Sequence, residues 1–341
     1  MNQTRIGFIG CGEHANANLL PSLSHVEKAE LVATCDIDKS KARTAAEVFG
    51  AKKCFMDYNQ MLEEIELDAI IVAGPPQLHF AAAKKALKKG VGVFVEKPPT
   101  IFTEELKKLA ELAKTKNIVT GVGHNVRYAK PYQTMEQIAS DPSFGNAICM
   151  NISFLSAKPR APLWGLKSVL RSFLLAQAIH PVDLLLSQMG LPQKVTANLH
   201  QDEQNAILLS VQLAFEDGKI GNLLTGSCAS HFQMDLEIIG DQSKIVRLDS
   251  LWNLNYQGAN IELENTLKVS KRWITTWSPS PLDTGYSRAG YLGELQEFIE
   301  SIRTERQMRP NFKDEILVYE TLDAIEKNVL TNKQEEKIHV H

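Results

Sequence analysis

Six short apolar segments alternate with helical segments over the first 122 residues, and this alternation constrains the fold more than any other feature. The apolar segments span residues 5–10, 30–36, 53–55, 68–73, 91–95 and 118–122. A helix between two strands carries the chain back to the same edge of a sheet, so successive strands pair in parallel. The pattern therefore predicts a doubly wound parallel sheet.

The pattern changes near residue 145 to longer strands in which apolar residues occupy every second position. Two pairs of such strands are joined by short turns of Gly and Asp: residues 207–215 and 219–225 through Asp217-Gly218, and residues 232–238 and 244–248 through Gly240-Asp241. Alternating strands on both sides of such a turn are typical of hairpins. We therefore expect an antiparallel sheet with one face uncovered by the rest of its domain.

The length of 341 residues exceeds what one hydrophobic core usually supports, so we predict two domains. The prediction is an α/β protein with a dinucleotide-binding domain over residues 1–122. Residues 123–341 would form an α+β domain with an open, mainly antiparallel sheet. Two late helices, near residues 291–303 and 313–328, could pack back on the first domain.

Composition excludes several classes of partner. A net charge of -3 lacks the excess of positive charge that is typical of proteins that bind nucleic acid or an anionic membrane surface. The five cysteines are scattered without a CxxC pair, which argues against a disulfide framework and against a zinc site. Neither a signal peptide nor a run of about 20 apolar residues is evident. We expect a cytoplasmic protein with no metal, no nucleic acid and no membrane partner.

A glycine-rich turn follows the first apolar segment, with the pattern Gly10-x-Gly12-x-x-Ala15. Small residues here allow a tight turn and a close approach of a pyrophosphate to the helix N-terminus. Asp36 ends the second strand, where the ribose-binding carboxylate of an NAD site belongs. A carboxylate repels the 2'-phosphate of NADP, so we predict NAD. Lys39, Lys41 and Arg43 could neutralise that phosphate, but they fit an exposed helix face better.

The strand at residues 91–95 ends at Glu96-Lys97-Pro98-Pro99. The prolines prevent the strand or a helix from continuing and hold the backbone there. Ligands bind beyond the carboxyl ends of strands in such sheets, so Lys97 is a candidate acid/base group. A solvated surface Glu–Lys pair explains the same residues equally well.

Five segments, in this order, carry a resemblance to a known family: GFIGCGEHA, CDID, AGPPQLH, EKPPT and GVGHNVRY. The chain resembles the Gfo/Idh/MocA oxidoreductases, the group of glucose-fructose oxidoreductase and inositol dehydrogenase. In that family a TPNxxH segment touches the cofactor, and EKP carries an active-site lysine. Pro75 and His79 agree with the former segment, whereas Gly74 and Pro76 replace its Thr and Asn. The resemblance and the glycine pattern together predict cofactor contacts at Gly10, Cys11, Gly12, Glu13, His14, Asp36, Ile37, Ala73, Gly74, Pro75, His79, Glu96, Lys97 and Asn125.

A leucine-rich helix over residues 174–189 contains His180 and Asp183, which fall on neighbouring positions of one helical face. A single histidine on such a helix is more often a core residue than a catalyst. The resemblance reverses this, because the family shows DxGxHxxD or NQxxHxxD here, with the histidine as acid/base. Gln177, His180 and Asp183 match, but Ala176 stands where the family has Asp or Asn. An aspartate one turn before His180 would orient the imidazole and raise its basicity, and alanine does neither.

The segment 156–168 carries Lys158, Arg160, Trp164 and Lys167, and Arg171 follows it. Cations beside an aromatic ring suit a phosphorylated, nucleotide-linked or carboxylated sugar, although an exposed basic loop is an equal explanation. The predicted substrate contacts are Lys97, Tyr128, Arg160, Trp164, Gln177 and His180.

The leading hypothesis is an NAD-dependent oxidoreductase that acts on a sugar, cyclitol or sugar derivative, with Lys97 and His180 handling the hydroxyl proton. A second hypothesis is an enzyme that recycles NAD during elimination or bond cleavage. A third is a non-catalytic dinucleotide-binding regulator. The resemblance also implies a homodimer or homotetramer, because the open sheet often mediates assembly in the family.

Overall fold

The computed structural model describes residues 3–258, 274–280 and 286–332. The chain divides into two compact units, residues 1–130 with 281–316 and residues 131–280 with 317–341. The boundary thus follows residue 130, and the first unit also takes in residues 281–316, which the prediction had placed in the second domain while allowing the late helices to pack back on the first.

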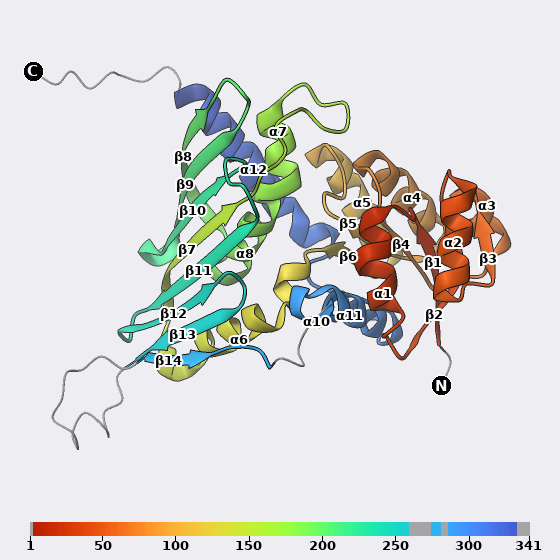
Figure 1. Ribbon diagram of the computed structural model, residues 1–341, viewed down its shortest axis with the longest axis horizontal. Helices are drawn as coiled ribbons and strands as arrows, with labels where there is room; N and C mark the ends of the chain where they lie inside the picture. The colour runs from red at the N-terminus through yellow and green to blue at the C-terminus, as the bar shows by residue number, and fades with distance from the viewer. Residues whose placement is uncertain (1–2, 259–273, 281–285, 333–341) are drawn as a thin grey trace, which may run out of the picture. The chain divides into compact units, whose positions relative to one another are not determined.

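The first unit is built on a parallel sheet, labelled in Figure 1. Among the described residues it has six strands in the order β3-β2-β1-β4-β5-β6. The strands are β1 Thr4–Ile9, β2 Ala29–Cys35, β3 Lys53–Phe55, β4 Ala69–Val72, β5 Gly92–Glu96 and β6 Thr120–Gly123. Every neighbouring pair is parallel. The prediction of a doubly wound sheet is confirmed, and the strand order reverses between β1 and β4, where such sheets bind ligands.

Helices connect these strands or follow the last of them, and the start of α2 illustrates how local side-chain chemistry sets a helix end. They are η1 Ala15–Leu19, α1 Leu20–Leu23, α2 Lys39–Phe49, α3 Tyr58–Glu64, α4 Pro76–Lys89, α5 Thr103–Lys116, η2 Asn125–Tyr128, α10 Tyr286–Ala289 and α11 Tyr291–Arg303. Asp38 caps α2 by accepting hydrogen bonds from the backbone N–H groups of Ser40 and Lys41. These bonds satisfy donors that have no partner inside the helix.

Helix α11 belongs to the core of the first unit, although it lies about 170 residues after β6 in the sequence. Its Phe298 packs on Phe94 of β5, with ring centroids 5.5 Å apart. The turn into α11 requires Gly290, whose φ is +91° and where a Cβ would lie 1.8 Å from the carbonyl oxygen of Asn125. The first unit therefore needs this late segment to complete its core.

The second unit is built on a large mixed sheet. Over the described part of the chain it has eight strands in the order β14-β13-β12-β11-β7-β10-β9-β8. They are β7 Ala147–Leu155, β8 Pro192–Gln201, β9 Ile207–Phe215, β10 Ile220–Gly226, β11 Gln233–Gly240, β12 Lys244–Asp249, β13 Asn253–Gln257 and β14 Ile274–Trp277. All neighbouring pairs are antiparallel except β7 and β10. This confirms both predicted hairpins and the mainly antiparallel character.

Helices cover one face of this sheet, and no helix of the described residues covers the other (Figure 1). The remaining helices are α6 Lys130–Ala139, η3 Pro142–Phe144, α7 Val169–Phe173, η4 Leu174–Ala178, α8 Ile179–Met189, η5 Glu216–Gly218 and α12 Phe312–Asn332. Helices α7, η4 and α8 run on continuously from Val169 to Met189. By length and composition this one stretch of the described chain is long and apolar enough to cross a membrane. Because 83% of its most apolar window is buried in the protein, it is the core helix of the second unit.

Candidate functional site

The glycine loop after β1 lies against the loop after β4. Gly10 has a φ of +90°, and a Cβ there would lie 2.0 Å from the carbonyl oxygen of Ala73, so only glycine fits. At Gly12, by contrast, a Cβ would meet no described atom within 4 Å. The side chain of Asn16 closes the loop by donating to the carbonyl oxygens of Cys11 at 2.8 Å and Gly12 at 2.9 Å. The loop is thus held rigid and presents an open backbone surface at Gly12, which suits a pyrophosphate.

The carboxylate of Asp36 is fixed at the carboxyl end of β2. Its Oδ2 accepts a hydrogen bond from the backbone N–H of Cys11, and its Oδ1 accepts one from that of Asp38, both at 2.8 Å. The carboxylate therefore stays beside the glycine loop and cannot swing away from a ligand there. Ile37 follows it with an 88% exposed side chain, an apolar surface at the same edge.

His79 joins the loops after β4 and β5. It is completely buried, and its Nε2 accepts a hydrogen bond from the backbone N–H of Gly74 at 2.9 Å. Since Nε2 is the acceptor, Nδ1 carries the proton and donates it to the carbonyl oxygen of Pro98 at 2.9 Å. Burial favours the neutral ring and lowers the pKa of His79 to about 4. His79 therefore positions the backbone of both loops.

Glu96 is buried at the end of β5 and joins this strand to the glycine loop. Its Oε1 lies 3.2 Å from Nε2 of His14, and its Oε2 accepts a hydrogen bond from the backbone N–H of Lys97 at 3.2 Å. Burial acts to raise the pKa of Glu96, but the hydrogen bond from His14 and the charge of Lys97 outweigh burial, so the pKa lies below its usual value. A buried, ionised Glu96 does not fit the alternative of a solvated surface pair, and Lys97 beside it is half-buried.

In the second unit, His180 lies on α8 and is 9% exposed. Its ring stacks on Phe154 of β7, with centroids 6.1 Å apart and an angle of 29° between the rings. Asp183 is buried one turn later, and Gln177 is half-buried. The π-helical turn η4, which contains Ala176, immediately precedes α8. A π-turn holds one extra residue per hydrogen-bonded ring, so the expectation that Ala176 sits one regular α-turn before His180 does not hold here.

Comparisons with known proteins identify the family. The model of an oxidoreductase family with an NAD-binding Rossmann fold, GFO_IDH_MocA, matches residues 4–124. The GFO/IDH/MocA C-terminal domain matches residues 132–246. A dehydrogenase from Chromobacterium violaceum is 35% identical, with a TM-score of 0.92 over 98% of this chain and 97% of that one. This chain belongs to the GFO/IDH/MocA oxidoreductase family. The resemblance expected from the motifs is confirmed, and the first unit is the NAD-binding Rossmann domain of this family.

Two curated GFO/IDH/MocA relatives are similar over shorter stretches. The dTDP-3,4-didehydro-2,6-dideoxy-alpha-D-glucose 3-reductase of Streptomyces violaceoruber is 28% identical over 150 residues, which are 44% of each protein. The glucose-6-phosphate 3-dehydrogenase of Bacillus subtilis (strain 168) is 30% identical over 150 residues, 44% of this chain and 42% of that protein. The chain thus spans less than half the length of these relatives.

The remaining predicted site residues of this GFO/IDH/MocA protein differ in their settings. Asn125 donates from its side-chain amide to the carbonyl oxygen of Ala289 at 2.7 Å, and the hydroxyl of Tyr128 donates to the carbonyl oxygen of Arg309. Both therefore tie the late segment to the first unit. Glu13, Gly74 and Pro75 are exposed around the glycine loop.

The basic segment at residues 156–168 is followed by one residue with a clear structural role. Arg171 contacts Asp323 at 2.6 Å and Glu326 at 3.3 Å, so two acids of α12 neutralise it. Within the segment, Arg160 is exposed, and Trp164 is half-buried in a left-handed conformation with φ of +55°.

Sequence reasoning missed Tyr291 and Glu294, which surround the His14–Glu96 pair. The ring of Tyr291 packs edge-on against His14 at 5.5 Å, and Glu294 is completely buried nearby on α11. Nearly 200 residues separate them from Glu96 in the sequence. The only available signal was an acid, Glu294, inside the apolar stripe of a helix.

Proposed function

We propose that the protein is an NAD-dependent oxidoreductase that transfers a hydride between nicotinamide and a hydroxyl-bearing carbon of a sugar or sugar derivative. The observation that carries the proposal is the arrangement at the carboxyl end of the parallel sheet. There, Glu96 ties the strand that ends in Lys97 to the glycine loop through His14. A lysine at this edge of an NAD-binding Rossmann domain is well placed to exchange a proton with a substrate hydroxyl.

The residues present fit NAD. The open backbone at Gly12 and the adjoining helix would hold the pyrophosphate, and Asp36 with Ile37 would receive the adenosine half. Because the Asp36 carboxylate is held by two backbone N–H groups, a 2'-phosphate would meet a charge that cannot move away. This supports NAD over NADP. When bound, the nicotinamide supplies the hydride acceptor or donor.

Proton transfer is assigned to Lys97 in the first unit and His180 in the second. A neutral amine or imidazole takes the hydroxyl proton as the carbon loses its hydride, and returns it in the reverse reaction. His180 has the stiff support that such a role requires, because Phe154 and the surrounding helix fix its ring.

For the substrate we propose a hexose derivative that reacts at carbon 3. The names of both curated relatives specify this position, on a nucleotide-linked sugar and on a sugar phosphate. An exposed Arg160 and a half-buried Trp164 in one loop suit a sugar that carries an anionic group.

One observation favours a second candidate. Ala176 and the π-turn around it depart from the helix that the family motif implies. A remodelled site of this kind suits an enzyme that uses NAD as a recycled redox group in an elimination. Such an enzyme would convert substrate without net formation of NADH.

Two measurements test these functions. NAD and NADP are first titrated by calorimetry, and hexose phosphates and nucleotide-linked hexoses are then screened for NADH formation by absorbance and for conversion by mass spectrometry. We expect Lys97→Ala to bind NADH within a few-fold of the wild type and to turn over about 100- to 10,000-fold more slowly. Unchanged turnover would remove Lys97 from the mechanism, and conversion without NADH would favour the recycled cofactor.

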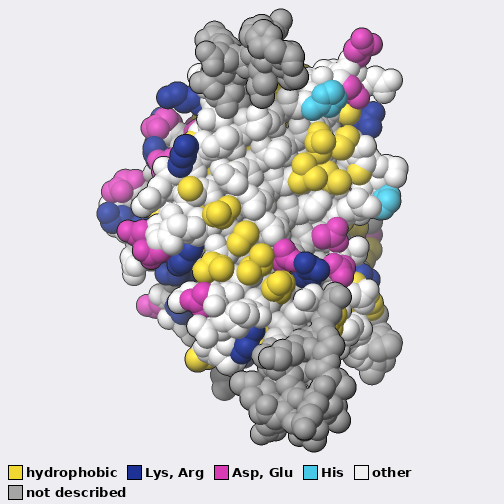
Figure 2. Space-filling view, turned by 90° about the vertical axis from the view of Figure 1, so that its left-hand side faces the viewer, with side chains coloured by type: hydrophobic (Ala, Val, Ile, Leu, Met, Phe, Trp, Pro, Cys, Tyr) yellow, Lys and Arg dark blue, Asp and Glu magenta, His cyan; other side chains and the backbone are white. Residues whose placement is uncertain are grey.

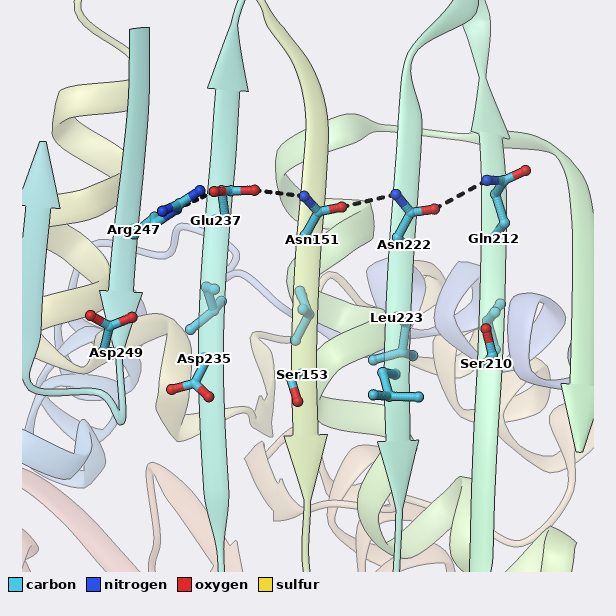
Figure 3. Close-up of a pocket in the computed structure, with 14 residues that line it drawn as sticks. Asn151, Ser153, Ser210, Gln212, Asn222, Leu223, Asp235, Glu237, Arg247 and Asp249 are labelled. Carbon is cyan, nitrogen blue, oxygen red and sulfur yellow. Dashed lines mark hydrogen bonds and ion pairs between the residues drawn. The ribbon is translucent and has the colours of Figure 1, made fainter. Parts of the chain in front are cut away.

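We also propose that the uncovered sheet face, shown in Figure 2, binds a second copy of the chain in a homodimer or homotetramer. Five side chains cross this face in one hydrogen-bonded row, the polar ladder of Arg247, Glu237, Asn151, Asn222 and Gln212 (Figure 3). Such a row offers donors and acceptors that a symmetric copy can match. Beside it, Ile220 and Leu224 are 39% and 41% exposed. We expect Leu224→Arg to lower the mass seen in light scattering, with Leu330→Arg on α12 as the control, and an unchanged mass would exclude this face.

For the cellular location we propose the cytoplasm. All five cysteines of the sequence lie in the described residues and are free thiols, and Cys54 and Cys228 are exposed. Exposed free thiols suit a reducing compartment.

A further inference from the structure

Glu294 is a buried carboxyl that the proposed reaction does not use. It lies in the first turn of α11, completely buried, between apolar residues that pack on the parallel sheet. Neither of its carboxyl oxygens has a hydrogen-bond partner among the described residues. A carboxyl in this setting is costly even when it is neutral, so its presence calls for a role.

The titratable groups around Glu294 come from three elements. Glu96 acts on it from the end of β5 and Tyr291 from the start of α11, and His14 of the glycine loop contacts both of these residues. His79 and Lys97 act on Glu96 in turn. Glu294 is therefore a second buried carboxyl beside Glu96, which together with the 45% exposed His14 links the glycine loop to the strand that ends in Lys97.

The surroundings shift the pKa values of Glu294 and Glu96 in opposite directions. Burial raises the pKa of Glu294 well above its usual value, and the charge of Glu96 raises it further. Burial would also raise the pKa of Glu96, but the hydrogen bond from His14 and the charge of Lys97 lower it. Two neighbouring carboxyls in an apolar site cannot both ionise easily, and the one that the His14 hydrogen bond and the Lys97 charge stabilise takes the charge. The pair thus carries one negative charge, on Glu96, next to His14.

We propose that Glu294 is a positioning residue for the cofactor loop, which acts as a neutral acid and leaves Glu96 as the single carboxylate that holds His14. Tyr291, one turn before Glu294, supports the other side of the His14 ring at 5.5 Å. The amide of Asn18 donates to Nδ1 of His14 at 3.2 Å, so His14 is held from three sides. Loss of the proton from Glu294 would place a second negative charge behind His14 and near the pyrophosphate-binding loop. We expect NADH to bind about tenfold more weakly in that state, because like charges repel strongly where water is excluded.

The inference rests on NAD binding by the first unit, and its test uses NADH affinity rather than turnover. The full chain, Glu294→Gln and Glu297→Gln are titrated with NADH by fluorescence from neutral to alkaline pH. The Glu294→Gln side chain would be neutral at every pH, whereas Glu297 lies on the same helix but pairs with Arg306 at the surface. We expect the wild type and Glu297→Gln to lose about tenfold in affinity at alkaline pH, and Glu294→Gln to keep its neutral-pH affinity throughout.

Two results would overturn the inference. One is a loss of NADH affinity at alkaline pH that also occurs in Glu294→Gln, or that does not occur in the wild type. The other is a Glu294→Gln variant that binds NADH more weakly at every pH, which would indicate a merely structural carboxyl.

Infrared spectroscopy of the cofactor-free wild type and Glu294→Gln supplies a measurement that needs no ligand. A protonated carboxyl band that the wild type shows at neutral pH and Glu294→Gln lacks supports the neutral acid, and two identical spectra refute it. If the wild type binds no NADH at neutral pH, the proposed function fails, and the infrared band still decides the state of Glu294.

Discussion

Acidification should destabilise the first unit through His79, and the structure gives the size of the effect. The ring is neutral and completely buried, and burial lowers its pKa from 6.5 to about 4. In the unfolded chain the same ring takes up a proton near its ordinary pKa. Between these two values the unfolded state binds more protons than the folded state, so stability falls as the pH falls. Each pH unit in this window lowers the free energy of unfolding by about 1.4 kcal/mol, and the whole window lowers it by about 3 kcal/mol.

The perturbation that isolates this effect is His79→Ala. At neutral pH the variant loses two hydrogen bonds, to the backbones of Gly74 and Pro98, and leaves a small cavity. We expect a cost of about 2 to 4 kcal/mol there. On acidification the free energy of unfolding of the wild type falls by about 3 kcal/mol through His79, and that of the variant does not. The difference in stability between the two proteins should therefore nearly vanish near the folded-state pKa of His79.

Hydrogen exchange is the suitable assay, because the sequence has no tryptophan within the ranges of the first unit, 1–130 and 281–316, to report on its unfolding by fluorescence. Amide protection of β4 and β5 is compared at neutral and acidic pH in the wild type, in His79→Ala and in His25→Gln, an exposed-histidine control. A stability difference between the wild type and His79→Ala that stays constant across this pH range would refute the reasoning.

Three further predictions concern the cofactor loop and the helix of His180. Asp36→Ser should bind NADPH roughly tenfold to a thousandfold more tightly than the wild type, since it removes a fixed charge, and fluorescence titration that shows no gain would contradict the assignment. Gly10→Ala should lower the melting temperature and NADH affinity together, because its Cβ would press on the carbonyl oxygen of Ala73, and a variant with wild-type values would show that the two loops separate easily. Ala176→Asp should move the pH–rate profile upward if the new carboxylate reaches the ring of His180 across the π-turn, whereas a larger KM with an unmoved profile would indicate a site remodelled around another substrate.

The sequence alone determined the fold class and the position of the glycine loop at the end of β1, because both depend on local patterns. Alternation of strands and helices implies parallel pairing, and Gly10 and Asp36 stand at set distances from strand ends. Hairpins with Asp-Gly or Gly-Asp turns are equally local, and both were confirmed. The motif EKP likewise marked the end of β5 from its prolines and its charges.

Tertiary structure alone decided which distant groups surround Glu96. The sequence allowed α11 to pack back on the first unit but did not show what it contacts there, because packing between elements depends on shape and burial over nearly 200 intervening residues. The same holds for His79: the sequence marked it as a cofactor contact, whereas the fold buries it completely and uses both ring nitrogens to hold two loops. The π-turn at Ala176 is a third case, since a one-residue change in helical register depends on what the helix packs against. Periodicity in the sequence reports which face of an element is apolar, but only the folded chain decides which charges and hydrogen bonds meet at its ends.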